Sequence, residues 1–168
     1  MASRNIEISF ASRRDAAALA RMSRDLIETG LGWGYRADRV AQMIDDPDCV
    51  ALVARDGPLP IGFAVMKFGD ERAHLVLLAV EPRHQRTGVG RKLLAWLIES
   101  AVVAGITSVH VELRAHNRVG LAFYRAMGFS ETLRVPGYYQ GRETAIRMIH
   151  MLRAPQMRAL PWRRPRDP

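Results

Sequence analysis

Alternating and continuous apolar segments predict strands in the first half of the chain. Residues 6–10 alternate as a half-buried strand does, and apolar runs cover residues 49–54, 61–67 and 73–81. The connections between these runs are short, and one contains the turn signal Asp56-Gly57. We therefore expect the last three of these strands to be neighbours in antiparallel order.

Apolar residues that recur every three or four positions predict helices. The expected helices run from the capping box at Ser12 and Asp15 to Gly30, over residues 37–45, from Val89 to Gly105, and from Asn117 to Gly128. Between the first two helices, residues 31–35 read Leu-Gly-Trp-Gly-Tyr. This segment is either a mobile loop that folds over a substrate or a filler of the gap between two helices, and the pattern favours neither.

The second half of the chain predicts a crossover followed by a hairpin. The strand at 106–113 returns through a helix to lie beside the strand at 73–81, which favours a parallel pair. Strands at 129–135 and 144–152 are close enough in sequence to pair antiparallel. The expected fold class is α/β (α+β): one domain over residues 1–152, with a mixed, mostly antiparallel sheet of roughly six to seven strands and about four helices.

The formal charge of +8 suggests a nucleic-acid partner, but half of this charge lies in the last 16 residues. Residues 153–168 hold five Arg and one Asp, a net +4, which leaves +4 for the rest. This Pro-rich tail is expected to be disordered when free, and we expect contact with nucleic acid only through it. Its Trp162 could stack on RNA or insert at an anionic surface, although a solvated tail is the simpler interpretation. The remaining excess suits a ligand with several phosphate charges.

Several function classes are excluded by composition. The single Cys49 cannot form an intramolecular disulfide, and its apolar strand is typical of a buried structural thiol. The five His residues show no paired metal-ligand spacing, so we expect no metal. Because no apolar run approaches the about 18 residues of a membrane span, and no secretory signal core is found, we expect a cytoplasmic protein without a membrane partner. It is expected to be a monomer or a homodimer.

A glycine turn follows the strand at 73–81. Gly88 and Gly90 lack a Cβ, so N–H groups at the start of a helix can approach an anion closely, with the positive end of the helix dipole behind them. A dinucleotide fingerprint would need a third Gly where Leu93 stands, and no Walker-type G-x-x-x-x-G-K-[ST] occurs. We therefore expect an anionic ligand other than a dinucleotide or a nucleoside triphosphate.

Two motifs resemble those of the GNAT acetyltransferase superfamily. Its acetyl-CoA signature is similar to Gln85-x-x-Gly88-x-Gly90 after an apolar strand, and its second motif is similar to Asn117 with Phe123-Tyr124 and Met127-Gly128-Phe129. Within the superfamily, the run 111–117, Tyr124 and Gly137-Tyr138-Tyr139 resemble the RimI-type protein N-terminal acetyltransferases. The resemblance implies a GNAT fold and transfer of an acetyl group from acetyl-CoA to a primary amine.

The resemblance also implies roles for individual residues. Glu112 matches a general base that acts through water, and Tyr124 matches the acid that protonates the sulfur of CoA. Main-chain N–H groups of Leu78, Ala79 and Val80 would bind pantetheine and stabilise the oxyanion. The other implied CoA contacts are Gln85, the pyrophosphate loop of Arg86, Thr87, Gly88, Val89, Gly90 and Arg91, and Asn117.

His74 is the second candidate for the base. It aligns with a strand position where other GNAT branches carry a catalytic carboxylate, and a neutral imidazole is a competent base near pH 7. It lies six residues before Val80, so a regular strand puts both side chains on one face, with His74 farther from the thioester than residues nearer the strand's end. We therefore rank His74 after Glu112.

Simpler explanations exist for each of these residues. Glu112 alternates with apolar neighbours and could point to solvent, Tyr124 could be a core aromatic, and Asn117 could be an ordinary N-cap. The matches in order and spacing favour the functional interpretation.

The sequence departs from the RimI-type pattern on the acceptor side. His116 stands where that pattern usually has Ser, and residues 31–35 diverge from the family's acceptor side. The expected acceptor is a protein N-terminal α-amine; the alternatives are a small amine such as a polyamine, amino acid or antibiotic, and a non-catalytic acyl-CoA-binding module.

Overall fold

The structure is a computed structural model that describes residues 5–152. The strands are β1 (Ile6–Phe10), β2 (Cys49–Asp56), β3 (Leu59–Phe68), β4 (Arg72–Val80), β5 (Ser108–Arg114), β6 (Ser130–Tyr139) and β7 (Glu143–Met151). The helices are α1 (Ala16–Leu26), α2 (Ala37–Asp45), α3 (Val89–Val103) and α4 (Arg118–Ala126), with 3-10 turns η1 (Arg13–Asp15) and η2 (Pro82–His84). The predicted tail at 153–168, with Trp162, lies outside the described residues.

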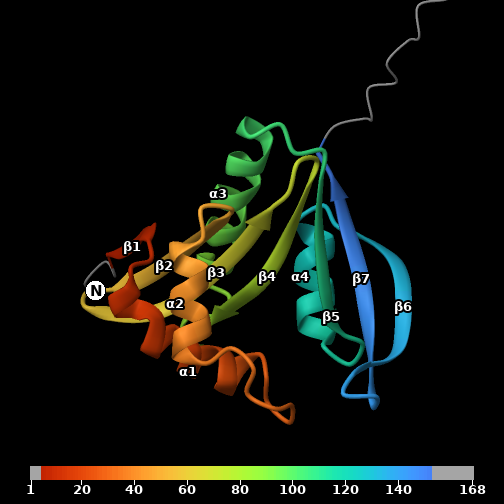
Figure 1. The fold of residues 1–168 in the computed structure, drawn as a ribbon, viewed down its shortest axis with the longest axis horizontal. Helices are drawn as coiled ribbons and strands as arrows, with labels where there is room; N and C mark the ends of the chain where they lie inside the picture. The colour runs from red at the N-terminus through yellow and green to blue at the C-terminus, as the bar shows by residue number, and fades with distance from the viewer. Residues whose placement is uncertain (1–4, 153–168) are drawn as a thin grey trace, which may run out of the picture.

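Seven strands form one mixed sheet in the order β1-β2-β3-β4-β5-β7-β6 (Figure 1). The neighbours are antiparallel except for β4 and β5, which are parallel on either side of the α3 crossover. The predicted fold class is confirmed. Within residues 5–152, no helix is both long and apolar enough to cross a membrane.

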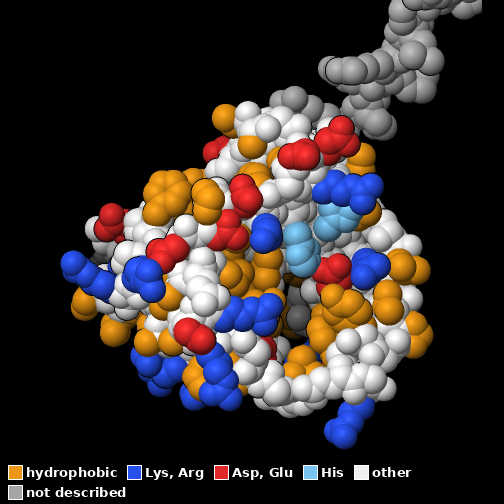
Figure 2. All heavy atoms as spheres, in the orientation of Figure 1, with side chains coloured by type: hydrophobic (Ala, Val, Ile, Leu, Met, Phe, Trp, Pro, Cys, Tyr) orange, Lys and Arg blue, Asp and Glu red, His pale blue; other side chains and the backbone are white. Residues whose placement is uncertain are grey.

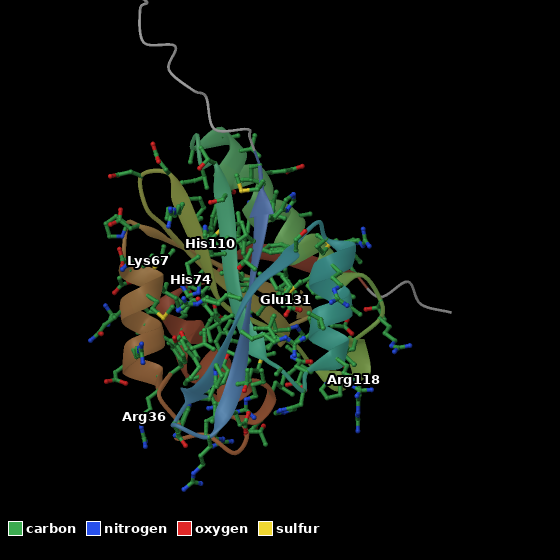
Figure 3. The ribbon with its side chains drawn as sticks, turned by 90° about the vertical axis from the view of Figure 1, so that its right-hand side faces the viewer. Arg36, Lys67, His74, His110, Arg118 and Glu131 are labelled. Carbon is green, nitrogen blue, oxygen red and sulfur yellow. The ribbon has the colours of Figure 1, made fainter. Side chains whose placement is uncertain are left out.

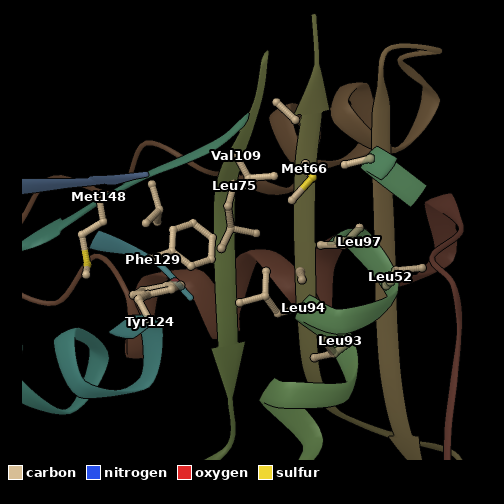
Figure 4. Packing of buried hydrophobic residues seen from close by; sticks show 14 of the residues in the cluster. Leu52, Met66, Leu75, Leu93, Leu94, Leu97, Val109, Tyr124, Phe129 and Met148 are labelled. Atoms are coloured by element: carbon tan, nitrogen blue, oxygen red, sulfur yellow. The ribbon is translucent and has the colours of Figure 1, made fainter. Parts of the chain in front are cut away.

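Helices cover both faces of the sheet, and each pair encloses a separate core. On one face, α3 and α4 pack through residues such as Leu93, Leu97 and Tyr124 (Figure 4). On the other face, α1 and α2 pack through Leu19 and Val40. The sheet is therefore fixed from both sides over β2 to β4, and the glycine turn follows the last of these strands.

Strands β4 and β5 separate soon after they pair. Their parallel ladder contains three residue pairs, the last of which joins His74 to His110. Beyond this point the two strands diverge, as Figure 1 shows, and the rest of β4 has no ladder partner on β5. The opening between them exposes main-chain groups and side chains of both strands.

A β-bulge at Val76 changes which face each residue of β4 occupies. On β3, Met66 pairs with Leu75 while Val65 pairs with Leu77, so Val76 is an extra residue. Leu75 accordingly faces the α3 and α4 core, whereas Leu77 faces the α1 and α2 core. The expectation that His74 and Val80 share a face was wrong, because the inserted residue shifts the alternation by one.

Two predicted boundaries were also wrong. Helix α1 ends at Leu26 rather than near Gly30, because the N–H groups of Ile27 and Glu28 both bond to the carbonyl of Ser23 and close the last turn. Strand β6 continues past Val135 to Tyr139 through an irregular register with β7. The longer β6 brings the two tyrosines at its end beside β5 and β7.

The segment between α1 and α2 is organised by the buried carboxylate of Glu28. This carboxylate accepts hydrogen bonds from the Ser23 hydroxyl (2.9 Å) and from the backbone N–H groups of Gly34 (2.7 Å) and Tyr35 (3.2 Å). The Trp33 indole N–H donates to the carbonyl of Ala20 (3.2 Å), and its ring lies against the α1 and α2 core. These contacts favour the gap-filling interpretation of residues 31–35.

Replacement of Glu28 by Ala should destabilise the protein by about 1–3 kcal/mol, because buried donors lose a charged acceptor. Urea unfolding followed by circular dichroism measures this. Asp25→Ala is the matched control, since Asp25 is an exposed acidic residue on α1, three residues before Glu28, and it should change stability by less than about 0.5 kcal/mol. Equal effects of the two substitutions would contradict the account of the loop.

Candidate functional site

The glycine turn between η2 and α3 has the backbone shape of an anion site. Gly88 is the N-cap of α3 with a φ of +90°, and no side chain caps the helix. The first N–H groups of a helix have no partner within it, so they are available to a ligand. Behind the turn, the Gln85 amide donates to the carbonyl of Val80 (3.0 Å), and the Thr87 hydroxyl donates to that of His84 (2.5 Å). The turn is thus fixed to the end of β4.

A cavity of about 590 Å³ runs from this turn to the opening beside β4; we name it the glycine-turn cavity. Most of the residues implied as CoA contacts line it: Leu78, Ala79, Val80, Gln85, Arg86, Gly88, Gly90, Arg91, Asn117 and Tyr124. Thr87 and Val89 do not. Val89 is buried beneath the turn, and Thr87 bonds to the backbone, so both shape the loop rather than line the cavity.

The glycine-turn cavity also has walls that sequence reasoning missed. They are Leu26, Val119, Gly120 and Phe123. Phe123 belongs to the motif that contains Tyr124, and this adjacency was the available signal; Leu26 comes from the distant α1, and no local pattern marks it. Asn117 combines two roles, since its side chain accepts from the Gly120 N–H (2.9 Å) as the N-cap of α4 and also lines the cavity.

A second cavity of about 670 Å³ opens on the face that carries α1 and α2; we name it the Glu112 cavity. Figure 2 shows a hollow on this face with histidine, acidic and basic side chains around it. The cavity is lined by His74, Glu112, Tyr35, Tyr138 and Tyr139, among others. The two cavities share Leu26, Leu78, Asn117, Val119 and Tyr124. They therefore meet beside β4, at the ring of Tyr124.

Glu112 and His74 form one hydrogen-bonded pair rather than two separate candidates. Glu112 Oε2 accepts from His74 Nε2 at 2.5 Å, and Glu112 Oε1 lies 3.4 Å from Nε of Arg147. His74 and His110, labelled in Figure 3, are paired in the register of β4 and β5, and Glu112 follows on the same face of β5. The β4–β5 ladder, which ends with His74 beside His110, therefore places the two candidate bases in contact.

The surroundings of Glu112 keep its carboxyl group ionised. The hydrogen bond from His74 lowers the pKa of Glu112, with help from the positive charge of Arg147 and against the opposing effect of burial. The Glu112 side chain is 17% exposed, so it faces the cavity and not bulk solvent, whereas that of His74 is 47% exposed. The pair therefore connects the interior of the cavity to solvent.

Tyr124 is buried in the α3 and α4 core and reaches both cavities. Its ring makes edge contacts with Phe123 (5.2 Å between centroids) and Phe129 (5.4 Å), the latter drawn in Figure 4. Burial raises the pKa of Tyr124 well above its ordinary value. The phenol stays protonated at neutral pH and can donate a proton but not accept one.

A family model described as "Acetyltransferase (GNAT) family" matches residues 20–129, which include the glycine turn, Glu112 and Tyr124. The chain belongs to the GNAT acetyltransferase family. Members of this family take the acetyl group from acetyl-CoA.

Similar proteins include acetyltransferases of ribosomal proteins. The [ribosomal protein bS18]-alanine N-acetyltransferase of Escherichia coli K12 is 38% identical over 89 residues, which are 51% of this chain and 60% of that protein. The alignment thus spans less than two thirds of the relative. The crystal structure of the ribosomal-protein-S18-alanine N-acetyltransferase from Escherichia coli superimposes with a TM-score of 0.78 at 25% identity, over 91% of this chain and 97% of that one. Arabidopsis thaliana NAA60 in complex with acetyl-CoA shares the fold, with a TM-score of 0.78 at 16% identity and coverage of 88% and 99%.

The residues of this GNAT chain fit acetyl-CoA. A Cβ built on Gly88 would meet nothing within 4 Å, so the turn leaves open space where a phosphate can approach the helix start. Arg86 and Arg91 line the same cavity and can neutralise phosphate charge. Leu78 to Val80 would hold the pantetheine arm.

Other reactive groups do not form a site in the described part of the chain. Within residues 5–152, no three His, Cys, Asp or Glu side chains gather as a metal-ligand set. Cys49 is partly buried, and burial raises the pKa of its thiol to about 11. Its thiol is therefore protonated at neutral pH, in line with the structural role predicted for it.

Gly88→Val should weaken acetyl-CoA binding at least about tenfold, because the new side chain enters the space beside the helix start. Isothermal titration calorimetry measures this. Gly105→Val is the matched control: Gly105 has a similar φ of +81° at the opposite end of α3, and a Cβ there also meets nothing. Both variants carry the same backbone strain, so equal binding by the two would show that the turn does not hold the donor.

Proposed function

We propose that this protein is an acetyl-CoA-dependent N-acetyltransferase whose acceptor is the α-amine of a protein N-terminus. The junction of the glycine-turn cavity and the Glu112 cavity, at Leu78 and Tyr124, carries the proposal. A donor that lies along the glycine turn and an acceptor that enters past Glu112 would meet at this junction. Proximity of this kind is a main source of catalytic rate.

Removal of a proton from the acceptor would fall to Glu112 and His74. An amine must be neutral to attack, and Glu112 is ionised and faces the cavity, so it can take the proton through one water molecule. A carboxylate with a lowered pKa holds a proton weakly. The 2.5 Å hydrogen bond that His74 donates orients the carboxylate and stabilises its ionised form, so that Glu112 can pass the proton on to water.

Tyr124 and the main chain of β4 would act on the thioester donor, which lies on the glycine-turn side of the junction. The donor, when bound, supplies a thioester carbonyl for attack and a thiol as the leaving group. The protonated phenol of Tyr124 can donate its proton to the departing sulfur. Main-chain N–H groups of β4 beyond the β5 ladder can stabilise negative charge on the carbonyl oxygen.

The walls of the Glu112 cavity support a peptide as the acceptor. Tyr138 and Tyr139 contact each other edge to face at 4.9 Å, and Tyr35 lines the opposite wall from the α1–α2 segment. Aromatic walls of this kind suit an extended backbone with small polar groups at its edges. The similarity to the bS18-alanine acetyltransferases supports the same acceptor class. A small amine is the alternative, since about 670 Å³ would also hold a drug-sized molecule.

Glu112→Gln should lower kcat by about 10² to 10⁴, and His74→Gln should lower it less, because Glu112 faces the amine and His74 acts through it. Since the two side chains share one hydrogen bond, the double variant should be about as slow as Glu112→Gln alone. Steady-state kinetics with acetyl-CoA and an acceptor peptide measure these rates. Additive losses in the double variant, or a larger loss for His74→Gln, would contradict the proposed pair.

A panel of acceptors tests the acceptor class. We expect acetylation of the α-amine of N-terminal peptides, at rates at least about tenfold above those of polyamines and aminoglycosides. The reason is that a peptide contacts more of the walls of the Glu112 cavity. Release of free CoA gives the rates, and fragmentation mass spectrometry locates the acetyl group on the α-amine or on a Lys side chain. Turnover confined to small amines would refute the peptide acceptor while leaving the acetyltransferase proposal intact.

A further inference from the structure

Arg114 occupies a position in the Glu112 cavity that the proposed reaction does not use. It follows Glu112 by two residues on β5, so both side chains lie on the face that carries His74. Its side chain is 15% exposed and lines the cavity. The spacing of two strand residues puts the backbone positions of Arg114 and Glu112 roughly 7 Å apart.

The guanidinium of Arg114 is held in place, and one of its donors is buried without a hydrogen-bond partner among the described residues. Its Nε lies 3.5 Å from Oε2 of Glu143, which is an ion pair without a hydrogen bond. Its Nη2 is buried and has no hydrogen-bond partner among the residues that the structure describes. The Tyr139 ring lies against the guanidinium, 5.9 Å from Cζ to the ring centroid. A buried donor without a partner is costly, and an arginine fork fits a carboxylate in two parallel hydrogen bonds.

The charges around Arg114 leave room for an added anion. Both oxygens of Glu112 contact His74 and Arg147, and Glu28 is occupied by Ser23 and the loop backbone. Glu143, which does not line the cavity, is shared between Arg114 and His116, whose Nδ1 lies 3.7 Å away. In the described part of the chain, the two acidic side chains that line the cavity, Glu28 and Glu112, therefore already have partners.

Arg118 also lines the cavity but is a weaker candidate for the same role. It is exposed, and Figure 3 shows it pointing away from the body of the protein at the start of α4. An exposed arginine keeps its hydration and gains less from a ligand than a buried one. The buried guanidinium beside Tyr139 is the better-built anion site.

We propose that Arg114 forms a carboxylate subsite that selects acceptors with a carboxylate close to the reacting amine. The inference rests on the proposed function, in which the amine lies beside Glu112. A carboxylate within about 7 Å of that amine comes either from Asp or Glu near the start of a peptide or from the α-carboxylate of a free amino acid. The shared chemistry is an amine with a nearby carboxylate, and the two sources are separate arms of the test.

The test compares matched acceptors that differ in one carboxylate. The peptide arm uses Ala-Glu-, Ala-Gln- and Ala-Lys- peptides of otherwise equal sequence, together with the same exchange at the third residue. The amino-acid arm compares alanine with alaninamide. For each acceptor, kcat/KM is measured with saturating acetyl-CoA in the wild type, Arg114→Gln, Arg114→Lys and Arg142→Gln. Arg142 is the control, because it is exposed on the turn between β6 and β7 and lines neither cavity.

We expect the wild type to prefer the carboxylate-bearing acceptor at least about tenfold, the effect of one charge-assisted hydrogen-bonded pair. The preference should fall to within about twofold in Arg114→Gln and be partly kept in Arg114→Lys, which has the charge but not the fork. It should be unchanged in Arg142→Gln. If Arg114→Gln does not fold, as judged by circular dichroism, Arg114→Lys and the wild-type comparison still decide the question.

Equal rates for Glu and Gln acceptors in the wild type, or a preference that persists in Arg114→Gln, would overturn the subsite while leaving the peptide acceptor standing. Acetylation of alanine but not of alaninamide or any peptide would support the subsite and refute the peptide acceptor. Failure to acetylate any acceptor in either arm would count against both proposals.

Discussion

The parallel pairing of β4 with β5 ends at His74, and the rest of the site depends on that early separation. A continuous ladder would satisfy the main-chain groups of β4 internally and would close the sheet between the two cavities. The separation instead leaves an opening bounded by one strand on each side. Leu78 on β4 and Glu112 on β5 are brought to the edges of this opening. Both cores hold it in place, since helices pack on each face of the sheet.

The bulge at Val76 makes the two edges chemically different. Before the bulge, His74 faces the side of α1 and α2, where it meets Glu112. After the bulge, Leu78 and Val80 face the side of α3 and α4, next to the glycine turn and Tyr124. The inserted residue therefore places His74 on the face of the Glu112 cavity and Leu78 and Val80 on the face of the glycine turn. Bulges beside active sites commonly redirect side chains in this way.

The shape of the glycine turn could be predicted from local sequence, because its parts are contiguous. Gly88, Gly90 and the helix start lie within a few residues, and their backbone requirements are visible in the residue types. The arrangement of the Glu112 cavity could not be predicted as well. The hydrogen bond between His74 and Glu112 joins residues 38 apart and depends on the register of β4 and β5, which no residue type marks. The role of residues 31–35 could not be predicted either, because Gly32 and Gly34 are compatible with both a mobile loop and a packed one. The hydrogen bonds that the loop backbone donates to Glu28 favour the packed loop.

In the proposed function, the two cavities form one continuous path for donor and acceptor, joined at Leu78 and Tyr124. The most direct test is the affinity of a conjugate in which the α-amine of a peptide is linked through an acetyl group to the sulfur of CoA. Filling both cavities should make it bind at least about 100-fold more tightly than CoA, because the second contact becomes intramolecular. A CoA derivative with a polyether chain of the same length is the control and should bind like CoA. Equal affinity of the peptide conjugate, the polyether derivative and CoA would contradict the account.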